Sequence, residues 1–314
     1  MRLRAGPLAA LAALGLGMSA VVLAYGEPVE KRDAEMVFIP GGTVMVGDDA
    51  APPSERPAFR FTTAGFFMDR TPVTVAQFAA FAQATGYTTD AEKLGSGLVL
   101  LPGGRGWAEV RGATWRRPFG PERARASLDH PVTQVSWNDA HAFCAHYGAR
   151  LPSEFEWERA ARLGQTPDGR VFKAGDPISF RERYFANVWQ GLFPILDEGK
   201  DGYTATSPVG AFGAAPSGLT DMAGNVWEWT ASWYRPYIGR ATSDRGSATE
   251  RVQRGGSFLC GANSCQGFRA TARGHSTPET SSIHIGFRCV ADGSVPPAGA
   301  GLVKPPVHAE VQGI

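Results

Sequence analysis

Cysteine is scarce in this chain, with 4 in 314 residues, and neither sign of charge dominates, because 31 basic residues balance 30 acidic ones. The formal net charge of +1 gives no reason to expect nucleic acid or an acidic surface as a partner. The chain also lacks internal repeats, heptads and any membrane span beyond its N-terminal segment. Glycine and proline, 39 and 23 residues, stay below the share of low-complexity chains. This composition predicts a folded domain rich in loops.

The first 24 residues have the composition of a targeting segment. Arg2 and Arg4 precede an apolar run from Leu8 to Leu23, and Val22-Leu23-Ala24 offers a small-residue cleavage site. The run is short for a membrane span, which needs about 20 residues, although an uncleaved anchor is an alternative. We expect residues 1–24 to be a signal peptide or N-terminal anchor. The domain is then exported, periplasmic or secreted, to a place where disulfides persist.

The opposite end of the chain, residues 293–314, combines proline and glycine with no apolar periodicity. Such a composition predicts a disordered tail. The folded part then spans residues 35–292.

Three segments of the folded part carry the signals of a helix. In each, a serine or threonine can cap the first turn, the residue three positions later can return the bond, and a glycine follows. These signals predict helices that begin after Thr74, Ser136 and Ser153 and end at Gly86, Gly148 and Gly164.

Strand signals are short, and the longest stretch of the domain has almost no regular pattern. Between Gly164 and Arg251 the chain is instead dense in glycine, aspartate, asparagine and tryptophan. Together these features predict a single α+β domain of low regular content, with long loops that serve a function. The predicted strands are Met36–Ile39, Phe59–Thr63, Phe66–Asp69 and Gly286–Ala291.

Two of the four cysteines, Cys260 and Cys265, lie close together after Gly255-Gly256-Ser257. Two thiols at this spacing can form a structural disulfide across a short loop. They can also turn both sulfurs onto one soft metal ion, and a two-sulfur site suits Cu(I), whereas structural zinc takes four ligands. Spacing alone leaves both interpretations open.

Two acidic clusters lie in the irregular region, one around Asn187 and Asp201 and the other from Asp221 to Glu228. Carboxylates and backbone carbonyls from irregular chain are the ligands that calcium takes. Neither cluster matches an EF-hand loop, and Asx-turns with solvated acids are the simpler explanation from spacing alone.

Four motifs lie between Glu35 and Asp292, namely Leu151–Glu158, Gly224–Trp229, Arg254–Ser257 and Gly286–Arg288. Together they resemble the formylglycine-generating-enzyme, or sulfatase-modifying-factor, family. The thiol pair after Gly-Gly-Ser is similar to that of the true formylglycine-generating enzymes. The resemblance implies the family's own fold, a single α+β domain of low secondary-structure content that is distantly like C-type lectins.

The resemblance also implies a reaction. A cysteine of an unfolded sulfatase polypeptide, in a Cys-x-Pro-x-Arg type motif, would be oxidised by O2 to Cα-formylglycine, with one Cu(I) held by Cys260 and Cys265. Two alternatives remain: a non-catalytic binding module with a disulfide at this position, and an oxidase of the same mechanism that acts on another cysteine protein. We expect a monomer without a nucleic-acid partner.

Further residues are assigned by the same resemblance. Ser257 would lie next to the reactive centre, and Trp227 beside the copper site. Trp227 and His284 would contact the substrate. Arg269 and Arg273, from their nearness to the thiols in the sequence, are expected to favour the thiolate form or to bind substrate carbonyls. Packing for the tryptophan, a surface ion pair for the arginines and a turn cap for the histidine are the structural alternatives.

The family match implies a structural disulfide between Cys144 and Cys289, which leaves Cys260 and Cys265 free for each other or for a metal. Two structural calcium sites are implied as well, one from Asn187, Val188, Asp201 and Tyr203, the other from Asp221, Gly224, Val226 and Glu228. The chain departs from the common family residues at Ser264, Gln266 and Gly267, which puts the substrate preference in question.

Overall fold

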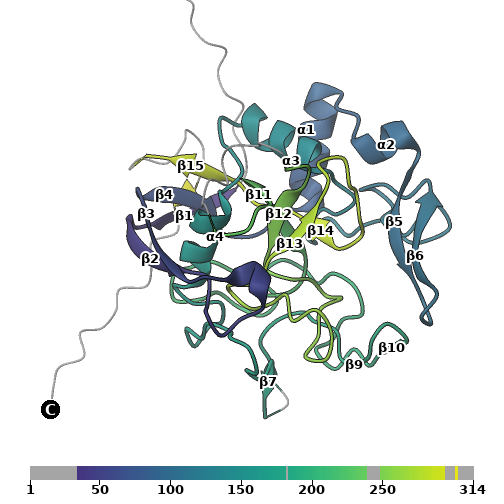
Figure 1. Ribbon diagram of the computed structural model, residues 1–314. Helices are drawn as coiled ribbons and strands as arrows, with labels where there is room; N and C mark the ends of the chain where they lie inside the picture. The colour runs from purple at the N-terminus through teal and green to yellow at the C-terminus, as the bar shows by residue number, and fades with distance from the viewer. Residues whose placement is uncertain (1–33, 182, 239–247, 294–300, 303–314) are drawn as a thin grey trace, which may run out of the picture.

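The computed structural model describes residues 34–181, 183–238, 248–293 and 301–302 (Figure 1). The predicted signal or anchor, residues 1–24, lies outside them. Within these ranges no helix is both long and apolar enough to cross a membrane.

Each α-helix of the described residues begins at a complete capping box, in which the cap side chain accepts from the third backbone N–H and the third side chain accepts in return. The three predicted helices are confirmed as α1 (Val75–Thr85), α3 (Trp137–His146) and α4 (Glu154–Ala161). The structure adds α2 (Asp90–Leu94), capped by Thr89 and Glu92. Its five residues are too few to show an apolar stripe, so the sequence pattern does not reveal it.

The first sheet has the strand order β15-β4-β1-β16 and joins the two ends of the domain. The register places Val37 opposite Met68 and Glu35 opposite Gly301. Residues 301 and 302 therefore form a strand within the tail that was predicted to be disordered, while most of that tail lies outside the described residues. The strands are β1 (Glu35–Ile39), β4 (Phe66–Asp69), β15 (Val290–Asp292) and β16 (Gly301–Leu302).

The second sheet has the order β13-β12-β11-β14 and lies at the centre of the molecule (Figure 1). The predicted strand Gly286–Ala291 is wrong as a single element. It is divided into β14 and β15, which belong to different sheets, because the buried Arg288 and Cys289 carry the chain from one sheet to the other. The strands are β11 (Trp227–Trp233), β12 (Arg251–Arg254), β13 (Gly274–Ser276) and β14 (Ile285–Gly286).

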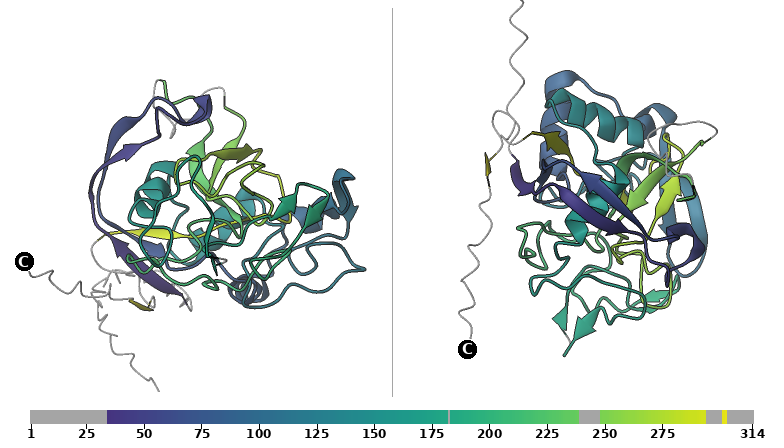
Figure 2. Two further views of the ribbon diagram at one scale, coloured as in Figure 1. Left: turned by 90° about the horizontal axis from the view of Figure 1, so that it is seen from below. Right: turned by 60° about the vertical axis from the view of Figure 1, so that its left-hand side comes forward.

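Four two-stranded hairpins surround the two sheets. β2 and β3 curve along one side of the molecule in Figure 2, and a short 3-10 helix, η1 (Pro53–Glu55), lies between them in sequence. The β5–β6 hairpin projects from the opposite side (Figure 1). The hairpins comprise β2 (Gly42–Val46) with β3 (Phe59–Thr63), β5 (Ser96–Leu101) with β6 (Gly106–Arg111), β7 (Ser179–Phe180) with β8 (Arg183–Tyr184), and β9 (Gly191–Leu192) with β10 (Leu196–Asp197).

An aromatic core packs α1 and α3 against the second sheet. Phe78 and Phe143 stack with ring centroids 5.8 Å apart, and Phe287 meets the Phe143 ring at 5.3 Å. A disulfide between Cys144 and Cys289 crosses this core, with a Cα–Cα distance of 5.7 Å. It ties α3 to the segment between β14 and β15.

Buried ion pairs hold much of the irregular chain in place. Four arginine–glutamate pairs have both side chains at most 5% exposed. The partners are far apart in the sequence, so each pair connects separate segments. Because removal of one partner would leave an uncompensated buried charge, these pairs specify how the loops dock. They are Arg254–Glu158, Arg269–Glu55, Arg273–Glu154 and Arg288–Glu228.

Candidate active site

Both central cysteines lie on one closed loop, residues 257–266, which we call the thiol loop. Its two ends cross at Gly256 and Gly267. A Cβ on Gly256 would lie 2.5 Å from the backbone of Gly267, and a Cβ on Gly267 would lie 2.5 Å from the Trp227 ring. Gly256 also has a φ of +71°, which favours glycine. The crossing requires glycine at both positions, and it holds the two ends of the thiol loop together.

The thiol loop brings Cys260 and Cys265 together. Their Cα atoms are 5.1 Å apart and their sulfurs are joined as a disulfide. Cys260 is buried, with 1% of its surface exposed, whereas Cys265 is exposed. A short turn supports this arrangement, because the Gly261 N–H donates to Ser264 Oγ at 2.6 Å. Both interpretations of the pair, disulfide and metal site, require this proximity, and the exposed Cys265 makes it accessible to a thiol from outside.

The two acidic clusters pack directly against the thiol loop. Trp189 donates its N–H to Cys260 O at 3.0 Å, and Phe258 donates its N–H to Asn225 O at 3.0 Å. The clusters also bind each other, since the Asn225 N–H donates to Asn187 O at 2.9 Å. The position of Cys260 therefore depends on the two acidic clusters, which are irregular chain held by backbone contacts of this kind.

The first predicted calcium set fits a cation. Asn187 Oδ1 is buried and has no hydrogen-bond partner. Burial raises the pKa of the Asp201 carboxyl, whose oxygens accept from the Val188 and Tyr203 N–H groups at 2.9 Å each. Gln190 Nε2 also donates to Asp201 Oδ2 at 2.7 Å and to Val188 O, so a cation would replace this amide as their partner. An unsatisfied buried oxygen in a set that includes a carboxylate is what an oxygen-binding cation would compensate.

The second predicted calcium set has its acids already engaged. Both Glu228 oxygens accept from Arg288 at 2.7 Å, and Oε2 also accepts from Trp157 Nε1 at 2.7 Å. Asp221 accepts from the Gly210 N–H at 2.6 Å. Burial raises the pKa of both carboxyls, while the Arg288 guanidinium opposes that rise. This set fits a cation less well, because a guanidinium already supplies the positive charge.

The two arginines predicted to contact the substrate are buried. Arg269 forms a bidentate ion pair with Glu55, with both N–O distances at 2.7 Å. Arg273 binds Glu154 at 2.8 and 3.0 Å and has a fully buried side chain. The observed ion pairs hold η1 and α4 against the segment that follows the thiol loop, and contact of either arginine with the substrate stays a prediction.

The remaining predicted residues lie close to the thiol loop. Trp227 begins β11, its ring packs against Gly267, and 8% of its surface is exposed. Ser257 is fully buried and accepts from the Leu259 N–H at 3.2 Å. His284 is partly buried, its ring lies 4.9 Å from that of Trp107, and burial lowers its pKa to about 3. The imidazole is therefore neutral at physiological pH.

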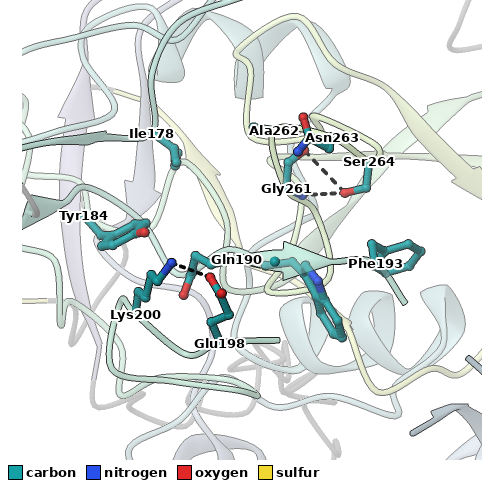
Figure 3. Close-up of a pocket in the computed structure, with 12 residues that line it drawn as sticks. Ile178, Tyr184, Gln190, Phe193, Glu198, Lys200, Gly261, Ala262, Asn263 and Ser264 are labelled. Atoms are coloured by element: carbon teal, nitrogen blue, oxygen red, sulfur yellow. Dashed lines mark hydrogen bonds and ion pairs between the residues drawn. The ribbon is translucent and has the colours of Figure 1, made fainter. Parts of the chain in front are cut away.

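A hollow of about 210 Å³, which we call the thiol hollow, opens beside the loop (Figure 3). Gly261 to Ser264 form one side of it, and Figure 3 shows the Glu198–Lys200 ion pair across from them. Sequence reasoning missed Tyr184, Glu198 and Lys200, because Tyr184 lies on the two-residue strand β8, the other two lie on irregular chain, and none shows a spacing signal. Among the described residues no group of three or more histidine, cysteine, aspartate or glutamate side chains is placed to hold a metal. A metal at the thiol loop would thus rely on two sulfurs.

A second hollow, of about 310 Å³, adjoins the other face of the loop, and we call it the apolar hollow. Phe258 and Leu259 form part of its lining, and Trp189 lines both hollows. The thiol loop therefore lies between a mixed polar cavity and an apolar one.

Comparison with known proteins defines the class. A family model described as "Sulfatase-modifying factor enzyme 1-like domain" matches residues 24–293. The chain belongs to this family, that of the formylglycine-generating enzymes.

Its relatives include both active and inactive members by name. The formylglycine-generating enzyme of Thermomonospora curvata is 43% identical over 284 residues, which cover 82% of this chain and 93% of that protein. The "Inactive C-alpha-formylglycine-generating enzyme 2" of Mus musculus is 39% identical over 285 residues, 84% of this chain and 88% of that protein. Among solved structures, PvdO from Pseudomonas aeruginosa superposes with a TM-score of 0.61 at 29% identity, covering 82% and 94% of the two chains.

Proposed function

We propose that this chain is an oxidoreductase that converts a cysteine of an unfolded sulfatase polypeptide, in a Cys-x-Pro-x-Arg type motif, to Cα-formylglycine with O2 as oxidant. Membership of the family and the identity to named formylglycine-generating enzymes support the substrate class. The observation that carries the proposal is the pairing of Cys260 with the exposed Cys265 beside a surface hollow.

The proposed cofactor is a single Cu(I) held by the thiolates of Cys260 and Cys265 after their disulfide is reduced. Two soft sulfur donors without a nearby group of other ligands fit this ion. When bound, it would supply the electron transfer to O2. Conversion of the substrate thiol to an aldehyde and sulfide releases two electrons, so full reduction of O2 to water needs two more, from an external thiol reductant.

The protein's own residues would position the reactants. Cys265 lies at the surface, and the thiol hollow would receive the polypeptide that carries the reacting thiol. The neutral His284 and the buried Ser257 offer uncharged hydrogen-bonding groups near the loop. A structural Ca²⁺ at the first set would stiffen the Asn187–Trp189 segment, which holds Cys260 through its backbone. We further propose that the protein acts as an exported monomer, anchored or released at its N-terminus.

The test is mass spectrometry of a cysteine peptide incubated with the copper-loaded, reduced protein in air. Conversion of the thiol to an aldehyde removes about 18 Da from the peptide. We expect Cys260→Ser and Cys265→Ser each to lose this product, because one sulfur cannot replace the pair. A serine variant that retains full turnover contradicts the proposal.

A binding module without catalysis is the second candidate, favoured by the identity to the inactive mouse relative and by the joined sulfurs. Titration of native thiols before and after mild reductant distinguishes the two. An enzyme yields two new thiols that take up one Cu(I) per chain, whereas a binding module keeps its disulfide. Conversion of peptides whose cysteine lies outside the sulfatase motif would instead indicate a different protein substrate.

A further inference from the structure

We propose that the apolar hollow is a specificity subsite that binds one bulky apolar side chain of the substrate polypeptide, near the cysteine that is converted. The inference rests on the proposed function, since it takes an unfolded polypeptide as the occupant. It adds a determinant that the Cys-x-Pro-x-Arg motif does not contain.

The lining of this hollow is suited to an apolar side chain. Leucine, isoleucine, phenylalanine, tryptophan, proline and glycine make up all of it except Asp197 and Thr204. The Asp197 carboxylate accepts through Oδ1 from the Gln190 and Gly199 N–H groups, at 3.0 and 3.2 Å, which fixes this acid at one side of the hollow. It is the one charged group among the described residues of the lining, and the volume of the hollow, about 310 Å³, accommodates a side chain such as leucine or phenylalanine.

Two hairpins frame the hollow. Leu100 and Leu101 come from β5, and Ile195 and Leu196 come from the β9–β10 hairpin. The hairpins meet where a Cβ on Gly104 would lie 3.3 Å from Ile195 Cγ1. Ile195 and Leu196 remain 56% and 58% exposed, a costly arrangement for two large aliphatic side chains unless something covers them.

Continuity with the thiol loop indicates the occupant. Leu259, part of the lining, directly precedes Cys260 in the chain, and Trp189 separates this hollow from the thiol hollow. Because the lining continues directly into Cys260, an extended polypeptide bound at the cysteine pair, which advances about 3.3 Å per residue, would need only a few residues to reach the hollow. An unfolded chain also exposes the apolar side chains that a folded protein would bury.

The experiment measures binding rather than turnover. The parent is a fluorescent peptide with the motif Ser-x-Pro-x-Arg, in which serine replaces the reactive cysteine. Serine also fills both x positions and the flanking positions, which are the free positions of the panel. A panel then places one leucine at each free position in turn, and anisotropy gives Kd for the full-length protein. Burial of a leucine side chain predicts a Kd about tenfold lower at one position of the panel.

The hairpin offers a matched pair of variants. Leu196 and Leu192 are cross-strand partners with 58% and 62% exposure, but only Leu196 lines the hollow. We expect Leu196→Asp to abolish the gain from the leucine and Leu192→Asp to keep it. Because both side chains are exposed, both variants should fold, which thermal unfolding checks.

Three outcomes would overturn the subsite. They are a panel in which leucine improves binding nowhere, a gain that survives in Leu196→Asp, and a gain that Leu192→Asp abolishes equally. Conversion of a matched cysteine peptide is measured separately. If leucine improves binding but no peptide is converted, the proposed function fails and the subsite stands. If the cysteine peptide is converted but leucine does not improve binding, the subsite fails and the proposed function stands.

Discussion

At the scale of single residues, the side-chain oxygen of Asn187 is a buried acceptor without a hydrogen-bond donor, and it belongs to the first predicted calcium set. It is buried and accepts no hydrogen bond, while its amide nitrogen donates to Ala205 O at 2.8 Å. Leaving such an atom unsatisfied costs roughly 1–3 kcal/mol. Asp201 lies in the same predicted set, with a pKa that burial raises, so a cation there would relieve both penalties.

Calcium should therefore stabilise the protein through this set. At 100 times its Kd, Ca²⁺ is expected to raise the free energy of unfolding by about 2.7 kcal/mol. Asp201→Asn removes the charge and should abolish that gain, whereas Asp176→Asn, at a partly exposed loop acid bonded to the Lys173 N–H, should keep it. Thermal unfolding with calcium and with chelator measures the effect, and equal unfolding in both would exclude the site.

Residue types were predictable from the sequence, but many of their partners were not. The thiols, the acid clusters and the cap residues all follow from local spacing. The role of Arg269 does not, because its partner Glu55 is 214 residues away in the sequence. The same holds for Arg273, whose partner Glu154 is 119 residues away.

At the scale of elements, the thiol loop depends on its crossing point. Gly267→Ala would place a methyl group against the Trp227 ring and the Gly256 backbone. We expect a loss of about 1–3 kcal/mol in the free energy of unfolding, typical of overpacking. Gln266→Ala, one residue earlier and partly exposed, should cost little. Urea unfolding of the two variants compares them, and equal stability would show that the crossing tolerates a side chain.

The contact between α2 and α3 should be sensitive to pH. Asp139 accepts from the Ser136 N–H at 2.8 Å and from the Asp90 N–H at 3.1 Å, and burial raises its pKa to about 6 from an ordinary 3.8. The native carboxyl thus holds a proton that the unfolded chain releases, so its stabilising contribution is full below about pH 4 and is lost as the pH rises through 6.

The shift in the Asp139 pKa corresponds to about 3 kcal/mol between pH 4 and 7. Asp139→Asn keeps an acceptor oxygen but cannot titrate. Urea unfolding across this range should therefore show a flatter pH dependence in the variant than in the wild type. Parallel curves would contradict the assignment.

Elements that arise from local chemistry were predicted well, and those that need distant partners were not. The capping boxes at Thr74, Ser136 and Ser153 are complete within four residues each, so the sequence shows them. The division between β14 and β15 depends on pairing with β11 and β4, which no local pattern reveals.

At the scale of the whole molecule, the two disulfides have different roles. Cys144 and Cys289 are 145 residues apart and fully buried, whereas Cys260 and Cys265 are 5 apart. In the chain-entropy model the long bridge stabilises the fold by about 5 kcal/mol and the short one by about 2 kcal/mol. The long bridge therefore supplies most of the stabilisation that the two cross-links give, and the fold depends little on the short one.

Replacing each pair by alanine tests this division. The Cys144→Ala/Cys289→Ala variant should lose about 5 kcal/mol in the free energy of unfolding, and Cys260→Ala/Cys265→Ala about 2 kcal/mol. Mild reductant should lower the stability of the wild type by no more than the second amount, because the core bridge is inaccessible. Equal losses in the two variants would contradict the assignment of structural and reactive roles.

The pairing of β1 with β16 has a practical consequence. Glu35 and Gly301 lie side by side in parallel strands, so both outward connections of the domain leave from one edge of one sheet. In Figure 1 that sheet lies to the left, and β9, which borders the thiol hollow, and β10, which borders the apolar hollow, lie to the lower right. A tether to a bead or carrier at this edge would therefore attach the domain on the side away from the two hollows. An immobilised form of the protein would then keep the hollows facing the solution.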